Sequence, residues 1–202
     1  MSRTISKSAK STKSTAPDRR KLILYVTLGI IIVALVVGVG LASRVPKAAS
    51  TPTSGASNLK VGDTAPEFSV QTNAGPFDLA QISTPVLVEI FATWCPHCQH
   101  ETVVLNHIAA QYAGKLAVVA VSGSPYGMDG STPESLADVN TFGQQFQVGY
   151  PLAFDPTNVV AQQYISTGFP TLVLVNSKKK VVWQASGETP EATIAKAISS
   201  TK

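Results

Sequence analysis

The chain has 202 residues and a formal net charge of +4, a length that allows one ordinary domain with accessory segments. Residues 1–21 alone carry a net charge of +6, from seven Lys and Arg against Asp18, so the rest of the chain is mildly acidic. The composition therefore does not indicate a nucleic-acid partner for the main domain.

The first 58 residues are predicted to form three accessory segments. Residues 1–21 are rich in Ser, Thr and Lys and nearly free of apolar side chains, so we expect a disordered, basic cytoplasmic tail. Residues 22–42 carry no charge, and as a helix they span the ~30 Å hydrocarbon core of a bilayer at ~1.5 Å per residue. Residues 43–58 have the small, polar, proline-bearing composition of a flexible linker.

The apolar stretch 22–42 has two interpretations. A cleaved signal peptide also starts with basic residues, but its apolar part is shorter, ~7 to 15 residues, and a small-x-small cleavage site follows it. The length here favours an uncleaved signal anchor, a single transmembrane helix. Because Lys and Arg collect on the cytoplasmic side, we expect a cytoplasmic N-terminus and a domain at residues 59–202 in the cell envelope, where disulfides persist.

Residues 59–202 alternate between strand and helix patterns. The strand patterns, each rich in β-branched or aromatic residues, are "FSV" and "PFDL" as an N-terminal hairpin, "PVLVEIFA", "LAVVAVSG", and "TLVLVN" with "VVWQAS" around the turn "SKKK". The run "PVLVEIFA" (85–92) is continuous, as expected for a strand covered on both faces.

Four helices are predicted between and after these strands. The first covers 96–112, and the second has Ser131 or Thr132 as its cap, Pro133 in its first turn and Leu136 and Phe142 on its buried face. A shorter helix starts at Asp155 and Pro156, and a final one follows Pro190. The order β-β-β-α-β-α-α-β-β-α predicts an α/β domain with a mixed sheet and helices on both faces.

The chain has two cysteines, Cys95 and Cys98, in "FATWCPHCQH", and several roles for such a pair can be compared. A disulfide across a ring this small stabilises a fold by ~2 kcal/mol, less than a long-range bridge would. A zinc site needs four ligands, and no second cysteine pair exists; haem attachment needs His after the second Cys, where Gln99 stands. Dithiol redox chemistry remains, with no metal and no cofactor beyond a Cys95–Cys98 disulfide.

The position of the pair suits that chemistry. Cys95 falls between a buried strand and a helix, where free backbone N–H groups and the helix dipole stabilise a thiolate. Pro96 fits the first helical turn, and Cys98 lies one turn further on the same side. We expect Cys95 to be the exposed nucleophile and Cys98 the more buried resolving thiol.

His97 stands between the cysteines. A protonated imidazole there would favour the Cys95 thiolate and make the disulfide more oxidising, and the Cys-Pro-His-Cys quartet is similar to that of the strongly oxidising DsbA proteins. The alternative is a solvent-facing loop residue.

Three stretches, "VGDTAPEFSV", "PVLVEIFATWCPHCQHE" and "GFPTLVLVN", resemble the thioredoxin-like domains of membrane-anchored, extracytoplasmic thiol-disulfide oxidoreductases of the TlpA and ResA type. The resemblance covers about residues 59–200. It implies a thioredoxin-like fold with an extra N-terminal hairpin, and a cis-proline at Pro170 packed against the disulfide. It also implies that the backbone of Phe169 pairs with a substrate chain as an added strand.

The resemblance gives Glu89 a possible role. It is the only polar residue of "PVLVEIF" and lies where thioredoxin has a buried acid that handles the proton of the resolving thiol, so Glu89 is expected to be a proton acceptor for Cys98. A carboxylate in water at the strand end is the alternative. Trp94 is expected to flank the site as a partly exposed surface, or to pack in the core, and Pro96 is placed with it among the substrate-binding residues.

These features predict an enzyme that exchanges disulfides with protein thiols outside the cytoplasm, leaning to an oxidising role. A reductant for cytochrome c maturation or another dedicated client stays open, as does a thioredoxin-like binding module without catalysis. The expected partners are client proteins with thiols or disulfides, and the membrane through residues 22–42. An unidentified redox partner is also expected, and the membrane is one candidate location for it.

Overall fold

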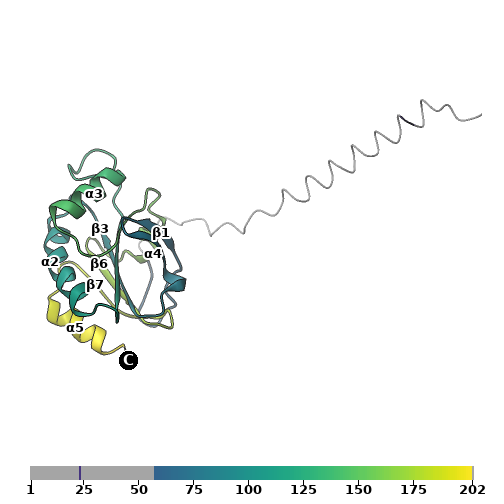
Figure 1. Cartoon of the computed structure of the whole chain (residues 1–202), viewed down its shortest axis with the longest axis vertical. Helices are drawn as coiled ribbons and strands as arrows, with labels where there is room; N and C mark the ends of the chain where they lie inside the picture. Colours follow the sequence, from purple (N-terminus) through teal and green to yellow (C-terminus); the bar gives the residue numbers. More distant parts are fainter. Residues whose placement is uncertain (1–22, 24–56, 202) are drawn as a thin grey trace, which may run out of the picture. The chain divides into compact units, whose positions relative to one another are not determined.

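The computed structural model describes Ile23 and residues 57–201 (Figure 1). The predicted cytoplasmic tail, the apolar segment apart from Ile23, and nearly all of the predicted linker lie outside the described residues. Within the described residues, none of the helices is long and apolar enough to cross a membrane.

A seven-stranded mixed sheet forms the centre of the domain, with strand order β2-β1-β5-β4-β3-β6-β7. Strands β3, β4 and β5 are parallel to one another, β6 is antiparallel to its neighbours β3 and β7, and β1 is antiparallel to its neighbours β5 and β2. The bounds are β1 Ser69–Thr72, β2 Gly75–Asp78, β3 Val86–Phe91, β4 Ala117–Ser122, β5 Leu152–Phe154, β6 Thr171–Val175 and β7 Val181–Ser186. The predicted mixed sheet and N-terminal hairpin are confirmed.

Strand β3 is buried on both faces, as its continuous apolar sequence predicts. Its side chains alternate between two cores. Leu87 and Phe91 belong to the core on one face, while Val86, Val88 and Ile90 belong to the core on the other. Glu89 shares the face of Leu87 and Phe91, so the strand carries one carboxyl into an apolar layer.

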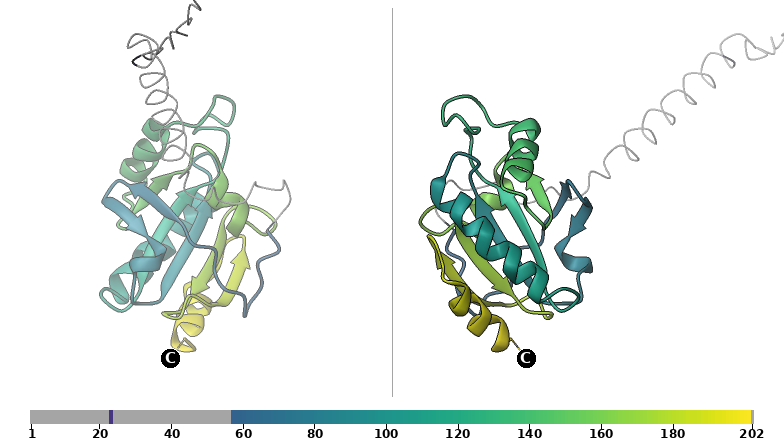
Figure 2. Two further views of the ribbon diagram at one scale, coloured as in Figure 1. Left: turned by 90° about the vertical axis from the view of Figure 1, so that its right-hand side faces the viewer. Right: turned by 60° about the vertical axis from the view of Figure 1, so that its left-hand side comes forward.

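Helices cover both faces of the sheet, which gives the thioredoxin-like α/β sandwich expected from the sequence. Buried side chains of three helices line the core with Leu87: α2 Pro96–Gln111, α3 Leu136–Gln145 and α5 Glu191–Ser199. Figure 2 shows α2 and α5 side by side on that face. The opposite core is lined by α4 Val159–Tyr164 and by Leu79 of the short 3-10 helix η1 Leu79–Gln81.

The start of α3 differs from the sequence-based expectation. Ser135 is the cap, and it forms a reciprocal capping box with Asp138, so the helix begins at Leu136 and the expected caps lie upstream of it. Leu136, expected on the buried face, is 55% exposed. The preceding residues form a hairpin-like turn instead, because Tyr126 bridges Pro133 and the Asp129 carboxylate accepts from the backbone N–H groups of Ser131 and Thr132.

Strand β5 was not expected, and α4 begins later than the Asp155–Pro156 signal indicated. With three residues, β5 is too short for its alternation to be recognised, and its pairing with β4 and β1 defines it. Asp155 caps α4 from a distance, since its carboxylate accepts from the N–H groups of Val160 and Ala161. The helix starts at Val159, with Asn158 as its N-cap residue, later than the expected start at Asp155 and Pro156.

Leu105 tests the packing of α2 on the sheet. It is fully buried in the core with Leu87, so Leu105→Ala should lower the free energy of unfolding by about 2 to 5 kcal/mol, measured by urea denaturation. Val103→Ala, on the exposed side of the same helix, is the matched control and should change it by less than about 0.5 kcal/mol. Equal effects of the two changes would contradict this packing.

Candidate functional site: a dithiol at the start of helix α2

Cys95 lies between β3 and α2, as the sequence predicts. It is the N-cap of α2 with an extended backbone conformation, and Pro96 follows in the first turn. The Cys95 carbonyl accepts from the N–H of Gln99, while the first N–H groups of the helix lack such partners within it. The positive end of the α2 dipole therefore lies at the Cys95 thiol.

Both sulfur atoms are free thiols, and both cysteines are buried. Cys95 is 4% exposed and Cys98 is completely buried. Cys98 is the more buried of the two, as expected, but the prediction that Cys95 is exposed was wrong. Cys95 is covered because the loop before β6 lies against it: its Sγ is 3.9 Å from the carbonyl oxygen of Phe169.

The loop before β6 has the form that the family resemblance implied. The Phe169–Pro170 peptide bond is cis, and Pro170 is buried at the start of β6. Trp94 packs edge-to-face on Phe169, with ring centroids 6.2 Å apart, and its indole N–H donates to Ser124 at 2.7 Å. At 38% exposure, Trp94 forms part of the surface beside Cys95. Pro96 is also exposed there.

Glu89 lies in the core below α2. Its Oε2 accepts from the Tyr150 hydroxyl at 3.3 Å, and its Oε1 is buried without a hydrogen-bond partner in the described structure. Burial, and then the nearby Glu101 carboxyl, raise the pKa of Glu89 to about 8. The alternative of a carboxylate in water is therefore wrong.

The same environment controls Cys98. Burial raises the pKa of the Cys98 thiol well above its ordinary value, and the Glu89 carboxylate raises it further. A carboxyl that titrates near neutral pH beside a thiol that resists ionisation can exchange a proton with it. The arrangement fits the predicted role of Glu89.

A second buried carboxyl, Glu101 of α2, was not identified from the sequence. Its Oε2 accepts from the Thr189 N–H at 2.8 Å, and its Oε1 has no hydrogen-bond partner in the described part of the chain. Burial, and more weakly the Glu188 carboxylate, raise the pKa of Glu101 to about 7. Its position could have been found, because Glu101 falls on the same helical face as Cys98 and Leu105.

His97 is solvent-facing and binds a carboxylate. Its side chain is 67% exposed, and its Nδ1 lies 2.5 Å from Oε1 of Glu188, which also lies 3.3 Å from Nδ1 of His100. The hydrogen bonds from these two imidazoles lower the pKa of Glu188. The structure thus gives His97 a partner that the sequence did not suggest, across 91 residues of chain.

Glu134 ties the loop between β4 and α3 to the site. Its Oε1 accepts from the Thr93 hydroxyl at 2.9 Å, and its Oε2 accepts from the Ser122 hydroxyl. Thr93 and Ser122 are both fully buried. Because Thr93 is two residues before Cys95, the carboxylate fixes the turn that leads to Cys95. These partners are distant in sequence, so no local pattern indicates them.

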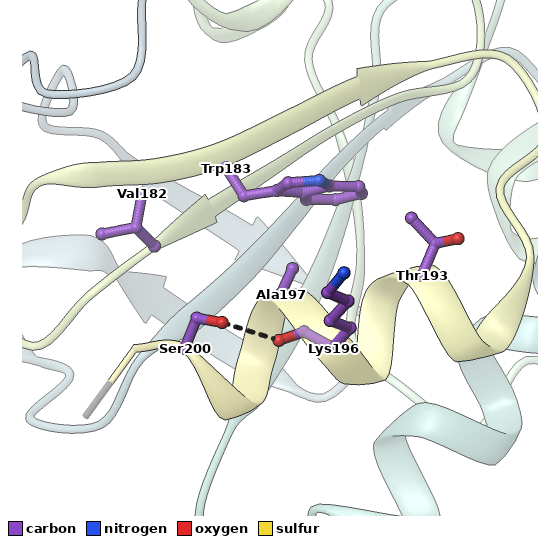
Figure 3. Close-up of a pocket in the computed structure, with 6 residues that line it drawn as sticks. All are labelled: Val182, Trp183, Thr193, Lys196, Ala197 and Ser200. Carbon is purple, nitrogen blue, oxygen red and sulfur yellow. Dashed lines mark hydrogen bonds between the residues drawn. The ribbon is translucent and has the colours of Figure 1, made fainter.

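Two cavities lie along α5 and the segment before it. One of about 350 Å³ adjoins the site and is lined by His100, Glu101, Val104, Glu188, Thr189 and Pro190. The other, about 380 Å³, lies between β7 and α5, with Trp183 and Lys196 on its walls and none of the predicted site residues (Figure 3). Among the described residues, no group of three or more His, Cys, Asp or Glu side chains is placed to hold a metal ion.

Glu89 should make stability depend on pH. The folded protein keeps the Glu89 proton up to about pH 8, whereas an unfolded glutamate releases it near pH 4.5, so stability should fall as pH rises between these values. In Glu89→Gln, the free energy of unfolding should fall by a few kcal/mol less between pH 5 and 8 than in the unmodified protein, measured by urea unfolding. Glu67→Gln, at an exposed position, should leave the slope unchanged. Parallel profiles for Glu89→Gln and the unmodified protein would contradict the burial of an ionisable group here.

Comparisons with known proteins agree with this geometry. Residues 60–198 match the family model described as Redoxin. Thioredoxin-like protein YneN of Bacillus subtilis is 30% identical over 122 residues, which cover 59% of this chain and 68% of the relative. Thiol-disulfide oxidoreductase ResA of Bacillus anthracis is 26% identical over 133 residues, or 64% of this chain and 72% of the relative.

A solved structure shows the same fold. A protein from Chlorobium tepidum described as thiol:disulfide interchange protein DsbE superposes with a TM-score of 0.63 and 26% sequence identity, covering 71% of this chain and 99% of that one. Residues 60–198, which match the family model, contain the whole sheet, both cysteines and the cis-proline. The chain belongs to the Redoxin family and is a thiol-disulfide oxidoreductase.

Proposed function

We propose that this enzyme acts outside the cytoplasm, anchored by residues 22–42, and donates disulfides to client proteins through Cys95 and Cys98. One observation carries the proposal: the Cys95 sulfur lies at the positive end of α2, 3.9 Å from the Phe169 carbonyl, with Cys98 buried one turn behind it. This arrangement provides a stabilised thiolate, a backbone for docking and a second thiol within reach.

The exchange proceeds in two steps. A client thiolate attacks the Cys95 sulfur of the Cys95–Cys98 disulfide, which forms a client–Cys95 disulfide and releases the Cys98 thiolate. A second client thiolate then attacks the client sulfur of that bond, which completes the client disulfide and releases the Cys95 thiolate. Two electrons pass from the client to the cysteine pair, and a separate redox partner must remove them.

Glu89 manages the proton of this exchange. The Cys98 thiolate is released into a buried environment that disfavours its charge, so it takes a proton from the neutral Glu89 carboxyl. In the reverse direction, the Glu89 carboxylate accepts that proton and frees Cys98 to attack. One buried carboxyl therefore serves both directions.

Client chains dock beside the cis-proline. Phe169 presents its backbone next to the Cys95 sulfur and can pair with an extended client segment as an added strand. Trp94, which packs on Phe169, and Pro96 supply exposed surface next to the thiol. Main-chain pairing fits a broad set of clients, because it does not depend on the client's side chains.

The Cys-Pro-His-Cys quartet supports the oxidising direction, since a histidine beside the nucleophile favours its thiolate. The Glu188 carboxylate against His97 favours the second candidate, a reductant for a dedicated client, because it offsets that charge.

A redox titration of the protein against glutathione distinguishes the two directions. The oxidising role requires a potential nearer the ~−120 mV of DsbA than the ~−270 mV of thioredoxin. A value near thioredoxin's would contradict the oxidising role and support the reductant.

Trapping tests catalysis against a binding module without redox chemistry. Reduced Cys98→Ser should attack client disulfides through Cys95 and accumulate mixed disulfides, because the resolving thiol is missing. Cys95→Ser is the matched control and should accumulate none, since Cys98 is completely buried. Mass spectrometry of non-reduced adducts provides the measurement. Full activity of Cys95→Ser would establish the binding module.

A further inference from the structure

Glu188 joins two imidazoles at the active-site end of α2. Its Oε1 lies 2.5 Å from Nδ1 of His97 and 3.3 Å from Nδ1 of His100. The two histidines are three residues apart, so they occupy the same side of the first two turns of the helix. Glu188 comes from the segment between β7 and α5 and lies outside the cysteine motif.

Backbone contacts hold the Glu188 segment in place on both sides. The Gly187 N–H donates to the Pro170 carbonyl at 2.8 Å, in the cis-proline loop, and Gly187 has a left-handed φ of 84°. The Thr189 N–H donates to the buried Glu101 carboxylate at 2.8 Å. The position of Glu188 is therefore fixed by the same elements that form the site.

We propose that Glu188 is a positioning residue for the dithiol: it compensates the charge of His97 and keeps the Cys95–Cys98 pair less oxidising than the Cys-Pro-His-Cys sequence would otherwise make it. This inference goes beyond the proposed function and applies to disulfide exchange in either direction.

The direction in which Glu188 shifts the redox equilibrium of the dithiol follows from the local charges. A protonated His97 paired with the Glu188 carboxylate is neutral as a unit, so it gives the Cys95 thiolate little net attraction. When Glu188 loses its charge, the surroundings of Cys95 become more positive or stay equal, whichever form His97 takes. A stabilised Cys95 thiolate favours the reduced dithiol, and the disulfide becomes a stronger oxidant.

The ionisable groups around His97 are Glu188 from the segment after β7, His100 and Glu101 from α2, and the two cysteines. Glu101 is already bound to Thr189 and is buried, so it does not replace Glu188 as the partner of His97.

The chain contains a matched control. His107, two turns after His100 on α2, lies 3.3 Å from Oε2 of Glu191, and the side-chain exposures of this pair, 65% and 44%, nearly equal the 67% and 44% of His97 and Glu188. Glu188→Gln and Glu191→Gln therefore remove the same charge from similar imidazole pairs, one at the dithiol and one remote from it.

In the experiment, each full-length variant is equilibrated with a glutathione redox buffer. The measured quantity is the ratio of reduced to oxidised dithiol. We expect Glu188→Gln to shift this ratio toward the reduced dithiol by about two- to fivefold, as for an exposed ion pair, and Glu191→Gln to leave it unchanged. An absent or opposite shift in Glu188→Gln, or an equal shift in both variants, would overturn the proposal.

The double variant His97→Gln/Glu188→Gln tests whether Glu188 acts by compensating His97. At pH 6 it removes both charges of a neutral pair, so its ratio should lie near that of the unmodified protein, between those of His97→Gln and Glu188→Gln. A double variant with the same ratio as Glu188→Gln would refute the compensation. The redox potential of the unmodified protein tests the oxidising role, whereas the differences between variants test the effect of Glu188. The proposed function and this inference can therefore fail separately.

Discussion

Side chains of α2 and β3 share one core, and the burial of this layer removes both the Cys98 thiol and the Glu89 carboxyl from water. Burial disfavours the charged form of each group, and a charge on either one disfavours a charge on the other. The layer between helix and strand therefore tolerates one negative charge far better than two. The proton transfer proposed between Glu89 and Cys98 keeps the number of negative charges in this layer at one.

Cys95, three residues before Cys98, has a different electrostatic environment. Its sulfur lies at the helix terminus, where unpaired N–H groups favour a negative charge, and the covering loop offers a carbonyl at 3.9 Å. Segments from four parts of the chain meet around it. Thr93 binds Glu134, and Gly187 binds Pro170, so these segments are fixed to one another by hydrogen bonds. The surroundings of Cys95 therefore depend on hydrogen bonds between several elements.

Local patterns predicted much of this molecule. The continuous apolar run of β3, Pro96 after Cys95 and the spacing of the cysteines identified the strand, the helix and the dithiol, because each depends on neighbouring residues. The start of α3 was misplaced, since Ser131 and Thr132 match a cap as well as Ser135 does, and the bridge from Tyr126 to Pro133 decides between them. Strand β5 was missed, because its three residues depend on pairing with β4 and β1.

The sequence by itself determined that two cysteines stand at a strand-to-helix junction, and it indicated Glu89 as the acid below them. The apolar segment 22–42 as a membrane anchor stays a prediction from sequence. Only the tertiary structure decided that Cys95 is covered, that Glu101 is a second buried carboxyl, and that Glu188 rather than a cysteine is the hydrogen-bonded neighbour of His97. The reason is range: burial and ion pairing depend on groups 74 to 91 residues apart in the chain, which sequence periodicity does not relate.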